Sequence, residues 1–275
     1  MIKRKLSYIH KPIIFSLIKT THMKNLYFTA LFFLFALAAN AQSVYPGNTK
    51  DGYGGALGKG SLSVSEDATN YYFTFTKGPG DLNDAVVIYL QTRAGGYSTT
   101  ANFTDEGDGL RNALSGVQGS DRATLTFPSS FRADFAIAFD QGFGGIWELV
   151  ENGSHNYKNS VGLTPTGTKT SPTYTFTLAK ADVGNPPGFE FIATYVSESG
   201  YRSNEFIGDD GPATNPQNGP YTVTSTLTFG SPLAIGFSNI TAQLNNHSVR
   251  ISWNTSDEET GGEFKVERSG NGTDF

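Results

Sequence analysis

The feature that most constrains the fold is a series of short segments in which apolar and polar residues alternate. In residues 70–76, Tyr71, Phe73 and Phe75 share one face, and a tyrosine and two threonines share the other. A period of two residues is typical of a β-strand with one buried face. Residues 85–90 are instead apolar on both faces, which predicts a central strand covered on each side.

Further strands are expected where runs rich in Phe, Tyr, Thr and Val lie between clusters of turn-forming residues. They cover residues 61–65, 123–127, 135–139, 146–150, 173–178, 189–196 and 222–229, and single helical turns are expected at 110–114 and 180–182. The resulting nine strands predict an all-β fold, a jelly-roll-like β-sandwich over residues 61–230. The glycine-rich residues 42–60 before it are expected to be irregular.

Residues 1–41 have the features of a signal peptide. Lys24 precedes an apolar run at 26–39, and a small-x-small sequence suited to cleavage ends at Ala41. The run is about fourteen residues, whereas a membrane-spanning helix needs about twenty, so a cleaved signal helix is favoured over an anchor. A further basic stretch precedes Met23; either Met23 is the true start, the simpler interpretation, or the basic region is long. We expect no membrane span in the mature chain.

Composition excludes several functions. The net charge is −5, but all six charged residues of 1–41 are basic, and removing them leaves 14 basic against 25 acidic residues, a net charge of −11. Such a surface repels phosphate groups, so we expect no nucleic-acid partner. The chain contains no cysteine, which rules out disulfides, thiolate metal sites and cysteine nucleophiles.

A second, incomplete sandwich is predicted over residues 231–275. Two strands are expected at 235–244 and 249–254, and a third begins at 264–268. Three strands do not close a sandwich, so the domain is interpreted as truncated.

Within this region the sequences Val-Arg-Ile-Ser-Trp-Asn-Thr at 249–255 and Phe-Lys-Val-Glu-Arg-Ser at 264–269 resemble a known module. It is the fibronectin-type-III-like module that precedes the sorting tail in exported proteins of Bacteroidota. The resemblance covers about 45 residues and implies a cargo of the type IX secretion system. It therefore implies export by Sec through the periplasm, contact with the type IX machinery, and a final location in the medium or at the outer cell surface. The sorting tail itself is not in the sequence, so this route is inferred from the neighbouring module.

The central region resembles β-sandwiches of the DOMON and carbohydrate-binding type. The resemblance lies in residues 86–92 with Gly95-Gly96, and in residues 174–184 followed by the strand at 189–195. It implies a polysaccharide or another surface ligand as the partner.

Catalytic candidates are few. His155 and His247 are the two histidines after residue 41, and they lie in different predicted domains, which disfavours histidine-dependent catalysis. The turn-like sequence around His155 predicts a solvated loop histidine. Paired carboxylates remain as an option for a glycosidase. The candidates are Glu148, Glu151, Glu190, Glu198 and Glu205. Glu148 and Glu190 alternate with apolar neighbours, as solvated strand residues do, so we expect no enzyme activity.

Two acidic loops are candidates for calcium. Asp105 and Asp108 lie among glycines in one loop, and Asp209 and Asp210 precede Gly211 in the other. Carboxylate and carbonyl oxygens are the ligands that calcium prefers. The spacing does not match an EF-hand, and a solvated acidic turn is the favoured alternative for each loop.

Aromatic residues are candidates for sugar binding, because exposed rings stack on the apolar faces of sugars. Trp147 is the main candidate, supported by Tyr157 or by Tyr201 and the polar residues 202–205. Alternation places Trp147 on the same face as Leu149, and a position in the core is the favoured alternative.

The sequence as a whole favours a secreted or cell-surface, non-catalytic β-sandwich protein that binds glycans or acts in adhesion. The alternative is an N-terminal accessory region of a longer secreted enzyme, such as a glycoside hydrolase.

Overall fold

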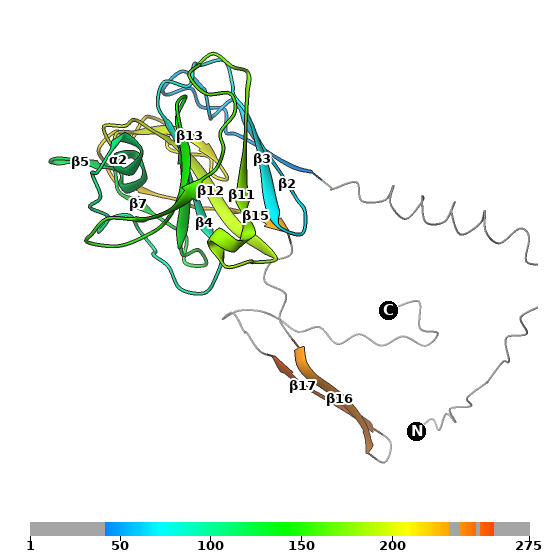
Figure 1. Ribbon diagram of the computed structural model, residues 1–275. Helices are drawn as coiled ribbons and strands as arrows, with labels where there is room; N and C mark the ends of the chain where they lie inside the picture. The colour runs from blue at the N-terminus through cyan, green and yellow to red at the C-terminus, as the bar shows by residue number, and fades with distance from the viewer. Residues whose placement is uncertain (1–41, 231–236, 246–247, 256–275) are drawn as a thin grey trace, which may run out of the picture. The chain divides into compact units, whose positions relative to one another are not determined.

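The computed structural model describes residues 42–230, 237–245 and 248–255. The predicted signal helix and its cleavage site, the strand at 264–268 and His247 lie outside these ranges. The described part is mostly β-structure in antiparallel sheets, as predicted (Figure 1). None of the helices in these ranges has the length and apolar character needed to cross a membrane.

A four-stranded antiparallel sheet contains β1 (Ser43–Pro46), β2 (Ser61–Glu66), β3 (Asn70–Thr76) and β11 (Thr173–Ala179), in that spatial order. Strand β11 pairs with β3 although about a hundred residues separate them, with Phe176 opposite Phe73. The alternation in β3 is confirmed, because Tyr71, Phe73 and Phe75 are buried while Tyr72 is exposed.

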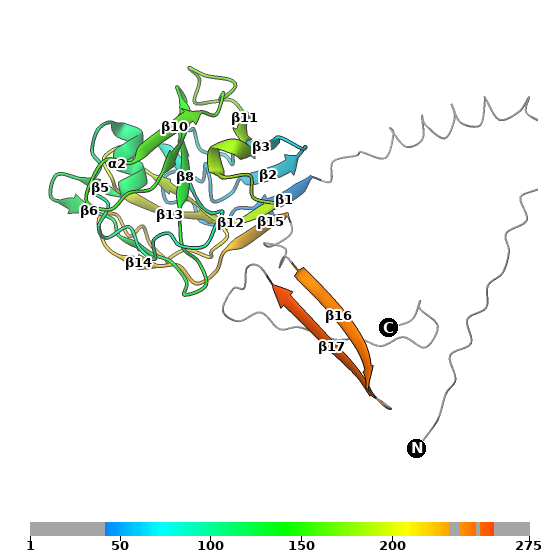
Figure 2. The same ribbon diagram turned by 60° about the horizontal axis from the view of Figure 1, so that its bottom comes forward.

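The larger, seven-stranded sheet forms the centre of the fold (Figure 2). Its order is β10 (Asn156–Ser160), β9 (Gly144–Glu148), β8 (Phe135–Phe139), β4 (Ala85–Gln91), β12 (Gly188–Val196) and β13 (Arg202–Ile207), and β15 (Leu227–Gly230) also pairs with β12. All of these pairings are antiparallel.

Both faces of the seven-stranded sheet are covered, and β4 shows why. Val86, Ile88 and Leu90 belong to the hydrophobic core shared with the four-stranded sheet. Val87 and Tyr89, on the other face, pack in a second core with residues of helix α2 (Gly109–Ser115) and the loops around it. Strand β4 is therefore buried on both sides, as predicted, and this explains why its sequence is apolar without interruption.

Helix α2 lies over the seven-stranded sheet, on the face opposite to β2 and β3 (Figure 1). Asp108 caps its N-terminus by accepting a hydrogen bond from the Arg111 N–H (2.9 Å). Gly116 ends it in the left-handed conformation, at φ 63°, where a residue with a side chain is disfavoured. The smaller elements are β5 (Val117–Gln118), β6 (Asp121–Arg122), β7 (Leu125–Thr126), the 3₁₀ turn η1 (Lys180–Val183) and β14 (Tyr221–Thr222), which pairs in parallel with β7.

Several predicted boundaries need correction. Residues 42–60 contain the strand β1 in addition to loops. The strand expected at 123–127 is reduced to the two residues of β7, and that expected at 222–229 is divided into β14 and β15. Strands β10 and β13 were not predicted, because β10 is exposed throughout and β13 begins with four polar residues.

Strands β16 (Phe237–Asn245) and β17 (Ser248–Thr255) form an antiparallel hairpin with Ile240 opposite Trp253. This confirms two of the three strands predicted after residue 230.

Candidate functional site

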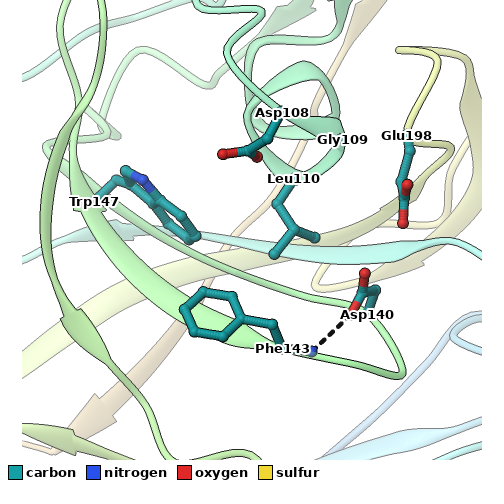
Figure 3. Close-up of a pocket in the computed structure, with 7 residues that line it drawn as sticks. All are labelled: Asp108, Gly109, Leu110, Asp140, Phe143, Trp147 and Glu198. Carbon is teal, nitrogen blue, oxygen red and sulfur yellow. Dashed lines mark hydrogen bonds between the residues drawn. The ribbon is translucent and has the colours of Figure 1, made fainter. Parts of the chain in front are cut away.

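A pocket of about 240 Å³ opens on the helix-covered side of the seven-stranded sheet (Figure 3). Its lining comes from three places in the chain: the start of α2, the β8–β9 hairpin with β9, and the turn after β12. The residues are Asp108, Gly109, Leu110, Asp140, Phe143, Trp147 and Glu198. Pockets for drug-sized ligands measure roughly 300–1,000 Å³, so this one suits a single sugar ring or a smaller group.

The β8–β9 turn is held by Asp140. One of its carboxylate oxygens accepts hydrogen bonds from the N–H groups of Gly142 (2.6 Å) and Phe143 (2.8 Å), and the Asp140 N–H donates to the Phe143 carbonyl (3.0 Å). The turn therefore holds Phe143 at the rim of the pocket with 42% of its surface exposed. An exposed phenylalanine fixed by its own turn is suited to contact a ligand.

Three aromatic rings lie next to one another at this edge of the sheet. Tyr157, on the edge strand β10, is 47% exposed, and its ring centroid is 6.5 Å from Phe143 and 5.6 Å from Trp147. Trp147 itself is 2% exposed, and its indole N–H is buried without a hydrogen-bond partner among the described residues. The exposed rings are therefore Phe143 and Tyr157, with Trp147 supporting them from below.

The acidic side of the pocket is formed by Glu198 and Asp140, opposite the rings of Phe143 and Trp147 (Figure 3). Partial burial, a hydrogen bond with the Asp140 side chain and repulsion from Asp140, Asp84 and Asp108 raise the pKa of Glu198. Negative charges close to a carboxyl group favour its protonated form.

Gly109 lets Glu198 approach the start of α2. A Cβ atom on Gly109 would lie 2.5 Å from Glu198 Oε2 and 2.8 Å from its Cδ, so a larger residue would displace the carboxylate. The backbone is held separately, because the Asn112 side chain donates to the Glu198 carbonyl (3.0 Å). The glycine thus sets the position of the Glu198 side chain.

The three predicted aromatic candidates lie in different environments. Tyr157 is exposed beside the pocket. Trp147 shares the second core with Leu149, so the favoured core alternative is confirmed, although the edge of its ring also lines the pocket. Tyr201 donates its hydroxyl to Asp121 (2.8 Å) and does not line the pocket, so the structure does not place it with the other two.

The two acidic loops predicted as calcium candidates are held by protein donors. Asp105 is buried and pairs with Arg111 (2.7 Å). Asp209 is also buried; it accepts hydrogen bonds from the Tyr221 hydroxyl and from the Thr224 N–H (2.7 Å) and hydroxyl (2.8 Å). These donors lower the pKa of both carboxyls against the effect of burial.

Within the described ranges there is no cluster of three or more metal-binding side chains suited to an ion. Asp108 caps α2 and pairs with Arg111, and Asp210 is exposed. The two loops are therefore explained by the fold, and calcium binding remains a prediction.

The prediction of a solvated His155 is wrong. The side chain is 2% exposed and packs edge-on against Phe103 at a centroid distance of 5.0 Å. Nδ1 accepts from the Val150 N–H and Nε2 contacts the Ser115 hydroxyl, each at 3.0 Å, which assigns the proton to Nε2 of a neutral ring. Burial lowers the pKa of His155 to about 4.

The polar residues 202–205 support the fold and do not form a sugar site. Glu205 is fully buried and accepts hydrogen bonds from four backbone N–H groups of the loop after β1, those of Tyr53 (2.7 Å), Gly55 (3.3 Å), Leu57 (2.9 Å) and Gly58 (3.1 Å). Arg202, also fully buried, donates to Thr194 Oγ1 (3.0 Å). Sequence reasoning missed this network because its partners lie far away along the chain.

The remaining question is whether the acids of the pocket match a glycosidase. In such enzymes the two carboxyl groups lie about 5–5.5 Å or about 6.5–9.5 Å apart, on either side of the bond that is cleaved. Asp140 and Glu198 instead lie on the same side of the pocket (Figure 3). Glu148, a second candidate, is engaged by Arg93 (2.6 Å) on the surface.

Searches against protein-family models, curated proteins and solved structures found no match to this chain. The site must therefore be interpreted from its own chemistry.

Proposed function

We propose that this chain is a secreted or cell-surface, non-catalytic β-sandwich protein that binds glycans through the pocket at the β8–β9 turn. The observation that supports this most is the exposed ring of Phe143, which lines the pocket together with Asp140 and Glu198 and has the exposed ring of Tyr157 next to it. Aromatic rings stack on the C–H faces of sugars, and carboxylates accept hydrogen bonds from sugar hydroxyls.

The export route is a second part of the proposal. The signal-peptide pattern ending at Ala41 supports passage through Sec, and the fibronectin-type-III-like resemblance of residues 231–275 supports type IX secretion. The finer classification of the sandwich as jelly-roll-like, and of the C-terminal strands as fibronectin-type-III-like, belongs to this proposal too. N-terminal sequencing of the exported protein should give Gln42 as its first residue, and a terminus at Met1 or Met23 would refute cleavage.

Glycan binding is tested by screening the purified protein against immobilised polysaccharides and then measuring hits by calorimetry. The variants Phe143→Ala and Tyr157→Ala should each weaken binding about tenfold, since ring stacking on a ligand contributes on the order of 1 kcal/mol or more. Tyr72→Ala is the matched control, because Tyr72 is a comparably exposed ring (39%) on the four-stranded sheet, outside the pocket lining. Binding to no polysaccharide would refute the proposal.

A further inference from the structure

The charge of the pocket restricts which sugars it accepts. Three of its seven lining residues carry carboxylates, and none of the seven is basic. Asp108 is partly neutralised, because Arg111 Nε lies 3.1 Å from its carboxylate. Asp140 and Glu198 line the same side of the pocket (Figure 3), and the described structure shows neither of them in an ion pair. An acidic sugar would be repelled from this pair.

The opposite wall carries the features that favour an organic cation over a metal ion. Phe143 lines the pocket and is 42% exposed, and aromatic faces attract ammonium groups. A calcium ion needs six to eight oxygen ligands, which a pocket walled by two rings and Leu110 does not offer. The indole N–H of Trp147 is buried and has no hydrogen-bond partner among the described residues; as a donor it needs an acceptor, such as a sugar hydroxyl oxygen, and does not itself favour a cation.

We propose that the pocket recognises a protonated amino group on a sugar ring, so that the preferred glycan is an amino-sugar polymer with free amines. This inference rests on the glycan-binding function proposed above and names its substrate class. The ammonium group would lie between the carboxylates of Asp140 and Glu198, while the ring of the same sugar contacts Phe143. The charged groups facing Glu198 are Asp140, Asp84 and Asp108, all acidic.

The experiment uses three oligosaccharides of equal length and linkage, made of glucosamine, N-acetylglucosamine or glucose. Calorimetry with the full purified chain, slightly below neutral pH, should show the glucosamine oligomer binding at least about tenfold more tightly than the other two, because a charge-assisted hydrogen bond contributes on the order of 1.5–3 kcal/mol. High salt should reduce this preference.

Two pocket variants and one control locate the effect. Glu198→Gln should abolish most of the preference for the amine, whereas Asp210→Asn, which removes an exposed carboxylate outside the pocket lining, should retain it. Gly109→Ala should act like Glu198→Gln, because its methyl group would displace the Glu198 carboxylate. Equal melting temperatures would show that the variants fold.

The possible outcomes separate the two proposals. Binding of all three oligomers with equal affinity would overturn the amine inference and leave glycan binding intact. Binding of none, together with no hit in the polysaccharide screen, would overturn both. A preference for glucosamine that Glu198→Gln leaves unchanged would overturn the assignment of the amine to this pocket.

Discussion

Lowering the pH from neutral to about 4 should destabilise the fold through His155. The imidazole is neutral and buried, and it accepts the Val150 N–H at Nδ1 (3.0 Å). A proton on Nδ1 would replace that acceptor with a second donor. Burial, reinforced by Arg111 and opposed by Asp105, lowers the pKa to about 4 from an ordinary value of 6.5.

The size of the effect follows from this shift. Between pH 6.5 and about 4 the unfolded chain binds a proton at this histidine and the folded chain does not, so stability falls as the pH falls. The depression of about 2.5 pKa units corresponds to about 3 kcal/mol, fully present above pH 6.5 and lost by about pH 4. This is a large part of the roughly 5–15 kcal/mol that stabilises a typical domain.

The assay is urea unfolding of the wild type and of His155→Asn at several pH values from about 7.5 to about 4. Asparagine does not titrate, and its carbonyl oxygen can accept the Val150 N–H in place of Nδ1. Other titrating groups occur in both proteins, so they largely cancel in the difference between the two free energies of unfolding. That difference should shrink by about 3 kcal/mol as the pH falls. A difference that stays constant over this range would refute the account of a buried neutral histidine.

Three further substitutions test two buried carboxylates, Glu205 and Asp209, and the rim of the pocket at Phe143. Glu205→Ala should lower the free energy of unfolding by about 3–5 kcal/mol in urea titrations, because four backbone N–H groups lose a charged acceptor; a loss below about 1 kcal/mol would contradict this. Asp209→Asn should cost about 1–3 kcal/mol at neutral pH, since Tyr221 and Thr224 donate to the carboxylate, and the penalty should diminish in acid; differential scanning calorimetry at two pH values would detect it, and a pH-independent penalty would count against the ionised carboxylate. Phe143→Ala should change stability by less than about 1 kcal/mol while weakening glycan binding, and a large loss of stability would show that the ring supports the fold instead.

The candidate site was only partly predictable from the sequence. Tyr157 was selected because aromatic residues suit sugar binding, and the structure does expose it at an edge strand. Phe143 is not among the sequence candidates, since nothing local shows that Asp140 holds its backbone. Glu198 is one of five scattered acids, and it lines the same pocket as Asp140 because the β8–β9 and β12–β13 turns lie at one end of the sheet.

The sequence by itself determined the β-class of this protein and the positions of its most regular strands. Residues 70–76 and 135–139 match β3 and β8, because a period of two and a bounded apolar run report directly on local burial. Only the tertiary structure decided which polar residues are buried. His155 and Glu205 occur in sequences that suggest solvent exposure, yet both lie inside, since Val150, Ser115 and the loop after β1 supply the hydrogen bonds that burial requires. A polar group can be buried only where hydrogen-bond partners from distant parts of the chain reach it, and the local sequence does not show those partners.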